Sequence, residues 1–442
     1  MSTFFDSGRL LDATHCATHG IPPGRFAELS RRVDRAAFAD GLTVIRNDAT
    51  VPYPMLPSLV QLDAELERGL AWAVPRVHRA LRKIVSAHRV DSALRSYLDV
   101  PGALLPWVDD SPESEYRIDF CRFDFVGGGS SPKIVEFNAN CPGGTIFTGA
   151  YGRLWREEPA VSALLAAWQV GDAQFDRRHW FPEFLLSTLG RRVEDRGGAG
   201  PVALFRKPGG NVLELDKMAA LLDELGWRAL VADPAAVKWP DEARLGYLKY
   251  GVQAVLGDIG GWAVFLDRIA EGKLRIVNPL PGRWIGDNKL CLAVMSDPRF
   301  ARLFDEEERA AIRMLVPYSR RVGDGVEPNE LQGARDQWVL KGPYDTRGNS
   351  VYVGAEQDAA TWRRLVDQAA REHWLAQLVV QPDTRVWDGE RLYQDLSVVL
   401  LRGRFAGYTS RLSRNFRVNV AQGGGRQVVF GHQSAGWPAD AL

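Results

Sequence analysis

The sequence predicts a protein of several subdomains with mixed α+β and α/β character, because different stretches of the chain have different patterns. Residues 1–110 are expected to be mainly helical, with apolar residues at helical spacing. Residues 156–285 alternate strand and helix patterns, which predicts an α/β domain with parallel sheet. Residues 286–442 end in long strand candidates typical of an antiparallel sheet. A hairpin at residues 111–155 separates the first two regions.

The helical prediction for the first region depends on one long apolar repeat. The stretch from Pro57 to Val90 has the spacing of an amphipathic helix, and Pro75 is expected to kink or split it. In the α/β region, PVALFRKPGG predicts a short strand followed by a glycine turn. In the last region, QWVLKGPYDTRGNSVYVG predicts a strand, a loop and a second strand.

The overall composition is that of an ordinary soluble globular protein. The chain has 442 residues, of which 45% are hydrophobic and 25% are charged, and its formal net charge is zero. No long basic run occurs, which argues against nucleic acid or a membrane surface as the main partner. The four cysteines form no CxxC pair, and the first residues lack a signal-peptide pattern. We therefore expect a cytoplasmic protein with reduced thiols, of unknown oligomeric state.

The most informative stretch is RFDFVGGGSSPKIVEFNANCPGG, where two strand-like segments flank a glycine–serine turn. Alternate residues of a strand share one face. If the turn is centred near Ser130, Asp124 lies opposite Glu136, and Arg122 lies opposite Asn138. The other face is expected to be core and carries Phe123, Phe125, Val135 and Phe137.

Two opposed carboxylates on this hairpin require an explanation. At about 5 Å and an effective dielectric of about 20 they repel by about 3 kcal/mol. Protonation of one acid, neutralisation by Arg122, or a divalent cation would each offset that repulsion. With Asn138 the face offers only oxygen ligands, which suits Mg²⁺ and not Zn²⁺. The alternative is that Asp124 and Glu136 are solvated residues on the exposed face of a hairpin.

Two lysines stand beside features that bind phosphates. Lys341 ends a strand and is followed by a glycine-containing loop, which can fold over a polyanion or be a plain turn. Lys289 stands at the start of a helix, where its charge adds to the attraction of the helix for a phosphate, or it is a surface lysine. Both interpretations stay open for each residue.

Arg411 and Cys141 also have two interpretations. Arg411 follows a strand of alternating pattern and can meet developing phosphate charge, or it belongs to a solvated arginine cluster. Cys141 follows the hairpin, but no histidine is near it in sequence to act as a base. We expect Cys141 to pack or to line a substrate.

Four blocks in this order resemble glutathionylspermidine synthetase and related circularly permuted ATP-grasp ligases. They are RFDF, KIVEFNANCPGG, GDNK and WVLKGPYDTRGNS, and the resemblance covers about residues 115–430. It implies a circularly permuted ATP-grasp fold that clamps ATP between two α+β subdomains. The helical N-terminal region and a pre-ATP-grasp-like α/β domain would complete the chain.

The resemblance also implies roles for individual residues. Asp124, Glu136 and Asn138 would bind two Mg²⁺ ions, while Arg122 and Arg411 would act on the transferring phosphoryl group or the intermediate. The residues implied to bind ATP are Lys289, Lys341, Gly348, Asn349, Ser350 and Gln381, the last of them near the adenine.

The implied activity is an ATP-dependent ligase that joins a small-molecule acid to an amine through an acyl phosphate. A small-molecule kinase and a non-catalytic scaffold with the same fold are the alternatives. The loop reads GPYDTRGNS and not the compact GRxGxN of the family. Neither spermidine nor glutathione is therefore supported as a substrate.

Overall fold

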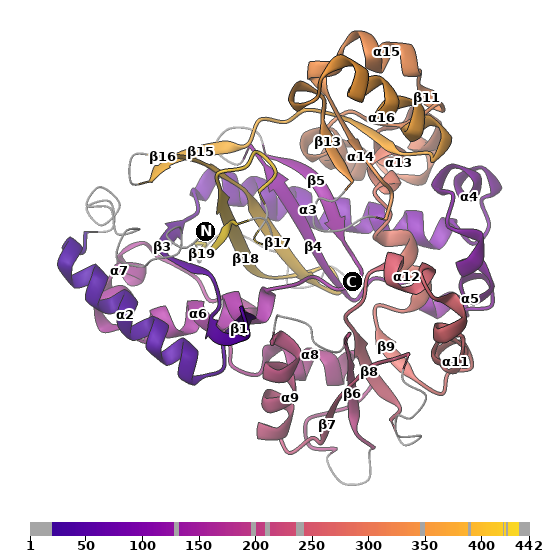
Figure 1. Cartoon of the computed structure of the whole chain (residues 1–442). Helices are drawn as coiled ribbons and strands as arrows, with labels where there is room; N and C mark the ends of the chain where they lie inside the picture. Colours follow the sequence, from indigo (N-terminus) through magenta and orange to yellow (C-terminus); the bar gives the residue numbers. More distant parts are fainter. Residues whose placement is uncertain are drawn as a thin grey trace.

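We describe the chain from a computed structural model, shown in Figure 1. The residues that the structure describes are 20–127, 132–195, 200–207, 213–235, 243–344, 350–387, 390–418, 420 and 423–432. Gly348 and Asn349, both predicted to bind ATP, lie outside these ranges, as does the turn at Ser130. Within the described ranges, no helix combines the length and the apolar character needed to cross a bilayer.

An eight-stranded sheet occupies the centre of the molecule (Figure 1). Six strands follow the order β15-β16-β18-β17-β4-β5, and β19 joins β18 to β3. All pairs are antiparallel except β19 with β3. The bounds are β3 Met55–Gln61, β4 Phe120–Val126, β5 Lys133–Asn138, β15 Asp383–Trp387, β16 Glu390–Gln394, β17 Leu396–Leu401, β18 Arg404–Ser413 and β19 Gly425–Phe430.

The first region contains strands that the sequence prediction did not include. Strand β3 enters the central sheet, and a separate two-stranded sheet pairs β1 (Thr43–Arg46) with β2 (Ala49–Pro52). The long helix α3 (Ala64–Ala87) is continuous through Pro75, so this proline does not split it. Asp63 caps its N-terminus by accepting a hydrogen bond from the backbone N–H of Leu66 at 2.9 Å.

Helices cover both faces of the central sheet. Phe123, Phe125 and Phe137 pack in one core cluster with α3, whereas Phe120 belongs to a second cluster that includes residues of α6. Other helices that contribute side chains to these two clusters are α2 Pro23–Ala39, α4 Ser92–Leu98, α5 Leu105–Asp109, α6 Thr145–Glu157, α7 Pro159–Ala167 and α8 Trp180–Thr188. Alternate residues of β4 thus pack in different core clusters. Arg122 and Asp124 therefore point to the same face of the sheet as Phe120.

A parallel sheet forms the α/β region, as the alternating sequence pattern predicts. Its order is β7-β6-β8-β9, and it lies at the bottom of Figure 1. The strands are β6 Val202–Phe205, β7 Ala229–Ala232, β8 Leu245–Leu248 and β9 Arg275–Val277. The helices are α9 Glu214–Glu224, α10 Val252–Leu256, α11 Ile259–Ala270 and α12 Leu280–Gly286.

A five-stranded sheet of order β11-β10-β14-β12-β13 carries Lys341 at the end of β12, and Figure 1 shows it at the upper right. The amphipathic helix α16 packs on it through Trp362 and Val366, which share a core cluster with Leu340. The strands are β10 Ser319–Val322, β11 Gly325–Val326, β12 Trp338–Lys341, β13 Val351–Val353 and β14 Leu375–Leu378. The helices are α13 Leu290–Ser296, α14 Glu306–Leu315, α15 Pro328–Gly333 and α16 Ala359–Arg371.

Short 3₁₀ turns link these elements. They are η1 Gly102–Leu104, η2 Glu113–Glu115, η3 Gln174–Asp176, η4 Pro298–Leu303, η5 Arg335–Gln337 and η6 Gly354–Glu356.

Candidate functional site

The β4–β5 hairpin has the predicted register. Asp124 lies opposite Glu136, and Arg122 lies opposite Asn138. One detail of the sequence prediction is wrong, because a β-bulge follows Asp124 and pairs Phe125 with Ile134. Ile134 is therefore buried in the core, while Val135, which we expected there, stays partly exposed.

The bulge also provides an anchor for Lys341. A bulged residue is left outside the regular ladder of hydrogen bonds. The Nζ of Lys341 donates to the Val135 carbonyl oxygen at 2.8 Å and to Oε1 of Gln377 at 2.7 Å. The hairpin and the five-stranded sheet meet at this contact.

Lys341 is buried, with 6% of its surface exposed, and it forms no ion pair with any residue that the structure describes. Burial lowers its pKa to about 8, although the nearby Glu136 carboxylate opposes that change. Its ammonium group therefore contacts only neutral oxygens and lies where a further negative charge would stabilise it.

The β4 side of the hairpin carries a row of alternating charges, which we call the arginine ladder: Arg122, Asp124, Arg411 and Asp395. Arg122 donates to both oxygens of Asp124, at 2.6 and 2.9 Å, and Nη2 of Arg411 lies 3.0 Å from Oδ2 of Asp124. Arg411 also donates to Asp395 through Nε at 2.6 Å and through its backbone N–H at 2.7 Å. Neutralisation by arginine is therefore the arrangement found around Asp124.

The carboxyl group of Asp124 stays ionised within this ladder. Burial alone would raise its pKa, but Arg122 and Arg411 together hold the pKa well below its usual range. Burial would likewise lower the pKa of Arg411, but Asp395 and Asp124 raise it above the ordinary value. Asp124 and Arg411 are thus both ionised, and their opposite charges compensate each other.

On the β5 side, Glu136 pairs with Lys289. The Nζ of Lys289 lies 3.0 Å from Oε1 of Glu136, and the glutamate side chain is 32% exposed. Lys289 immediately precedes α13, so the predicted helix start is correct. Asp287, two residues earlier, accepts hydrogen bonds from the backbone N–H groups of Ala139 and Asn140 at 3.0 and 3.1 Å. Burial raises the pKa of Asp287 to about 6.

The donor set of β5 fits a hard cation better than that of β4 does. The Nδ2 atom of Asn138 is buried and has no hydrogen-bond partner in the described part of the chain, so this N–H group can donate to a ligand, whereas a cation would need the Oδ1 atom of the same amide. Glu136 is partly exposed, whereas both oxygens of Asp124 are already held by guanidinium groups. Among the described residues, no three acidic, histidine or cysteine side chains gather as a ready-made metal cluster.

The loop after the hairpin brings a further arginine to the site. The carbonyl oxygen of Gly143 accepts from Nη1 of Arg122 and from Nη2 of Arg426, both at 2.9 Å. Gly144 has φ of +75°, and a Cβ atom there would lie 2.5 Å from Cζ of Arg426, so only glycine fits this turn. Glu214 accepts from the backbone N–H of Gly144 at 3.1 Å and thereby fixes the start of α6.

Three other residues singled out in the sequence, Gln381, Ser350 and Cys141, lie outside the arginine ladder and the lysine contacts. Gln381 is exposed on the connection between β14 and β15. The carbonyl oxygen of Ser350 accepts from the N–H of Gly342 at 3.0 Å, at the base of the loop between β12 and β13. Cys141 is partly exposed, and burial raises the pKa of its thiol. A raised thiol pKa disfavours the thiolate and therefore a nucleophilic role.

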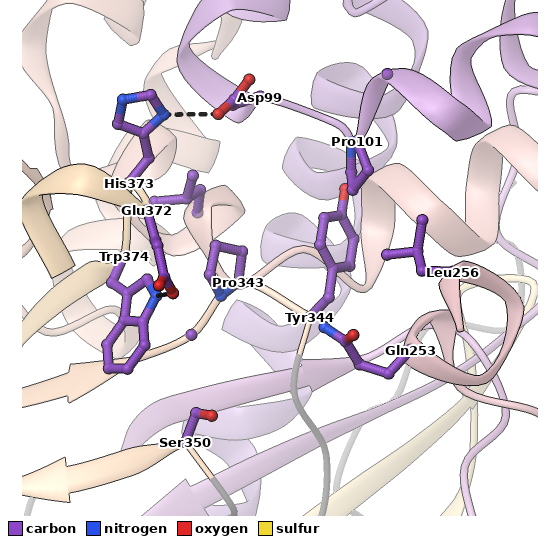
Figure 2. A pocket seen from close by; sticks show the side chains of 13 residues that line it. Asp99, Pro101, Gln253, Leu256, Pro343, Tyr344, Ser350, Glu372, His373 and Trp374 are labelled. Atoms are coloured by element: carbon purple, nitrogen blue, oxygen red, sulfur yellow. Dashed lines mark hydrogen bonds and ion pairs between the residues drawn. The ribbon is translucent and has the colours of Figure 1, made fainter. Parts of the chain in front are cut away.

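A cavity of about 440 Å³ lies at this same loop base, and we call it the β12–β13 pocket (Figure 2). Its lining residues are Asp99, Pro101, Gly102, Gln253, Leu256, Leu290, Gly342, Pro343, Tyr344, Ser350, Glu372, His373 and Trp374. Two hydrogen bonds form its wall towards the lysines: Asn288 Nδ2 to the Tyr344 hydroxyl at 3.0 Å, and Lys289 N–H to the Pro343 carbonyl at 3.0 Å.

Comparison with known proteins gives a likeness in fold. No protein-family model and no curated protein matches the chain. A solved structure of a glutathione synthetase-like effector, GSS30 from Globodera pallida in apo form, matches with a TM-score of 0.58 at 12% identity, over 91% of this chain and 96% of that one. A structure described as a gamma-glutamylcysteine synthetase from Methylobacillus flagellatus KT scores 0.36 at 12% identity, over 78% and 85% of the two chains. The chain therefore shares its fold with a glutathione synthetase-like protein.

Proposed function

We propose that this chain is an ATP-dependent ligase that joins a small-molecule carboxylate to an amine through an acyl phosphate. The observation that supports this most directly is the meeting of Lys341, Lys289 and Glu136 beside the arginine ladder. The likeness in fold to a glutathione synthetase-like effector agrees with it. We further propose that the fold is a circularly permuted ATP-grasp, and that the protein acts in the cytoplasm.

Lys289 and Lys341 would bind the phosphates of ATP. Lys341 suits this role because its buried ammonium group contacts only neutral oxygens, so an added phosphate would supply the missing negative charge. The loop residues Gly348, Asn349 and Ser350 would cover the phosphates, and Gln381 would lie near the adenine. A covered site excludes water, which would otherwise hydrolyse an acyl phosphate.

Magnesium fits the β5 side of the hairpin. Glu136 would offer a carboxylate oxygen and Asn138 its Oδ1 atom. Asp124 belongs to the oxygen set implied for two ions, although both of its oxygens accept from guanidinium groups. When bound, Mg²⁺ would neutralise phosphate oxygens and orient the γ-phosphate for transfer. Asp124 would contribute chiefly through the two guanidinium groups that it holds in place.

The reaction would proceed in two displacements. A carboxylate oxygen of the acid attacks the γ-phosphorus, and the bond from phosphorus to ADP breaks. Arg122 and Arg411, fixed by the ladder, stabilise the charge on the transferred group. The amine nitrogen then attacks the acyl carbon, the carbon–oxygen bond breaks, and phosphate leaves as the nitrogen loses a proton. No side chain acts as a covalent nucleophile.

ADP release tests the proposal. Purified protein with Mg²⁺-ATP is incubated with a panel of acids, each with and without amines, and hydroxylamine is added to trap an acyl phosphate as a hydroxamate. A ligase yields a hydroxamate with its acid, whereas a kinase that phosphorylates a hydroxyl group does not. If no acid and amine pair produces ADP although Mg²⁺-ATP raises the melting temperature, the ligase proposal fails. If Mg²⁺-ATP leaves the melting temperature unchanged, a scaffold is favoured.

A further inference from the structure

We propose that the β12–β13 pocket is a second binding site for a small organic cation, next to the proposed ATP site and sharing Ser350 with it. Its volume of about 440 Å³ lies in the range of about 300–1,000 Å³ that small-molecule sites occupy. Ser350, proposed above to cover the ATP phosphates, lines it, whereas none of the residues proposed to bind magnesium or to act on the transferred phosphoryl group does. The chemistry of its lining defines the ligand.

The charges of the described residues that line the pocket disfavour anions. Asp99 and Glu372 are its acids and His373 its one basic side chain, and no lysine or arginine occurs among the described residues that line it. A phosphate or carboxylate would therefore meet net negative charge and no fixed cation. A positively charged group would be attracted, because one of the two acids is not neutralised.

That acid is Glu372. Its Oε1 accepts from Nε2 of Gln368 at 3.0 Å, and its Oε2 accepts from Nε1 of Trp374 at 2.9 Å. Both donors are neutral, and no ion pair forms to Glu372 from the described residues. Asp99 differs, since it lies 2.6 Å from Nδ1 of His373, as the dashed line in Figure 2 marks. Glu372 is thus an exposed carboxylate that accepts from two neutral donors, and its charge is available to a ligand.

The rest of the lining suits a hydrocarbon body. Tyr344, Trp374, Leu256 and Leu290 line the pocket together with two prolines, and Figure 2 shows Tyr344 and Leu256 on the side opposite Trp374. Apolar and aromatic surface beside a carboxylate recognises an ammonium or guanidinium group on a short hydrocarbon. We therefore assign the ligand to this class.

The position of the pocket suits an effector. Leu290 follows Lys289 and Gly342 follows Lys341 in sequence, so the pocket touches the backbone beside both lysines. The Asn288–Tyr344 and Lys289–Pro343 hydrogen bonds separate it from their side chains. A ligand here would contact the segments that carry the lysines without entering the proposed reaction site.

Ligand-observed NMR titration of the full chain tests this proposal. The probes are n-butylammonium, 1-butanol and butyrate, which have similar bodies and differ in charge. We expect n-butylammonium to bind at least about tenfold more tightly than the other two, as one charge-assisted contact gives. Equal binding of the alcohol and the ammonium probe, or no binding of the ammonium probe, would overturn the proposal.

Two variants locate the binding. Glu372→Gln keeps an oxygen for the Trp374 N–H but removes the charge, and it should lower the affinity for n-butylammonium about tenfold. Gly102→Trp places a large side chain at a lining residue where a Cβ atom would meet no atom within 4 Å, so the substitution is tolerated by the backbone and should reduce access to the pocket. Glu113→Gln, on a different surface, is the matched control. If both pocket variants fold and bind n-butylammonium like the wild type, the assignment is wrong.

The outcome is independent of the proposed ligase activity. Lys341→Met should bind n-butylammonium normally while losing Mg²⁺-ATP, and Glu372→Gln should show the reverse. Joint loss of both ligands in either variant would overturn the inference of two separate sites.

Discussion

The two strands of the β4–β5 hairpin hold their charges in opposite ways. On β4, Asp124 is buried and bound by two arginines, and the second of these is also bound by Asp395. On β5, Glu136 is partly exposed, and Lys341 beside it contacts only neutral oxygens. On the β4 side the charges are paired without a ligand. On the β5 side, Lys341 lacks a carboxylate partner among the described residues, so an anionic ligand could bind there. The difference indicates that the arginines on the β4 side have a structural role, whereas Lys341 on the β5 side could bind an anion.

The largest expected effect is the difference in unfolding free energy between variants that lack Asp124 and variants that lack Glu136. Asp124→Ala leaves two guanidinium groups buried beside a single remaining carboxylate, and we expect a loss of about 3–5 kcal/mol in the free energy of unfolding. Glu136→Ala removes a carboxylate of 32% exposure but leaves Lys289, which is 5% exposed, without this partner, so we expect a smaller loss of about 1–2 kcal/mol. Urea unfolding of both variants measures the difference. Losses of equal size would contradict the contrast between the two strands.

Lys341→Met tests whether the β5 side of the hairpin binds the phosphates of ATP. We expect at least tenfold weaker binding of Mg²⁺-ATP, which removes about 1.4 kcal/mol of stabilisation by the nucleotide. Without nucleotide the variant should be as stable as the wild type or more so, because a buried charge without a carboxylate partner is removed. Thermal unfolding with and without Mg²⁺-ATP measures both effects. Lys273→Met, at an exposed lysine paired with Glu271, is the control, and an unchanged shift in Lys341→Met would exclude the phosphate role.

The pH dependence of the unfolding free energy also tests the burial of Lys341. The pKa of Lys341 is lowered to about 8 from an ordinary 10.5, so the folded chain releases this proton before the unfolded chain does. Stability contributed by this group therefore rises with pH between pH 8 and pH 10.5, by at most about 1.4 kcal/mol per pH unit. We expect the unfolding free energy of the wild type to rise in this window relative to that of Lys341→Met. A constant difference between the two across this range would refute the lowered pKa.

The smallest effect is expected at Cys141. Its thiol has a raised pKa and no assigned role in the reaction, so Cys141→Ala should change the unfolding free energy by less than about 1 kcal/mol. Alkylation by iodoacetamide at pH 7 should be slow at this residue in the folded protein. Peptide mapping after alkylation measures this. Rapid modification of Cys141 would show that its surroundings favour the thiolate.

Local patterns predicted the parts of the site that are local in sequence. The register of Asp124 with Glu136 follows from alternation on both sides of one short turn. The bulge at Val135 was not predictable from the sequence. With or without the extra residue, the strand has an apolar face and a polar face, so the pattern does not distinguish the two registers. The continuous helix through Pro75 was also missed, since neighbouring packing overrides the local cost of a proline.

Partners from distant segments could not be read from spacing. Asp395 and Arg411 belong to the last third of the chain, and they reach Asp124 only because β17 pairs with β4. Arg426 and Glu214 join the Gly143–Gly144 loop from two further elements. A buried arginine or glutamate in a strand or helix signals that a charged partner exists, but not where it lies.

The pairing of β3 with β19 has a consequence for biosynthesis. Residues 55–61 emerge from the ribosome early, yet their neighbour in the central sheet is residues 425–430. The early strand must wait, unpaired along its edge, while most of the polypeptide is translated. Completion of the sheet is therefore a late event, and the nascent chain depends on shielding of that edge until then.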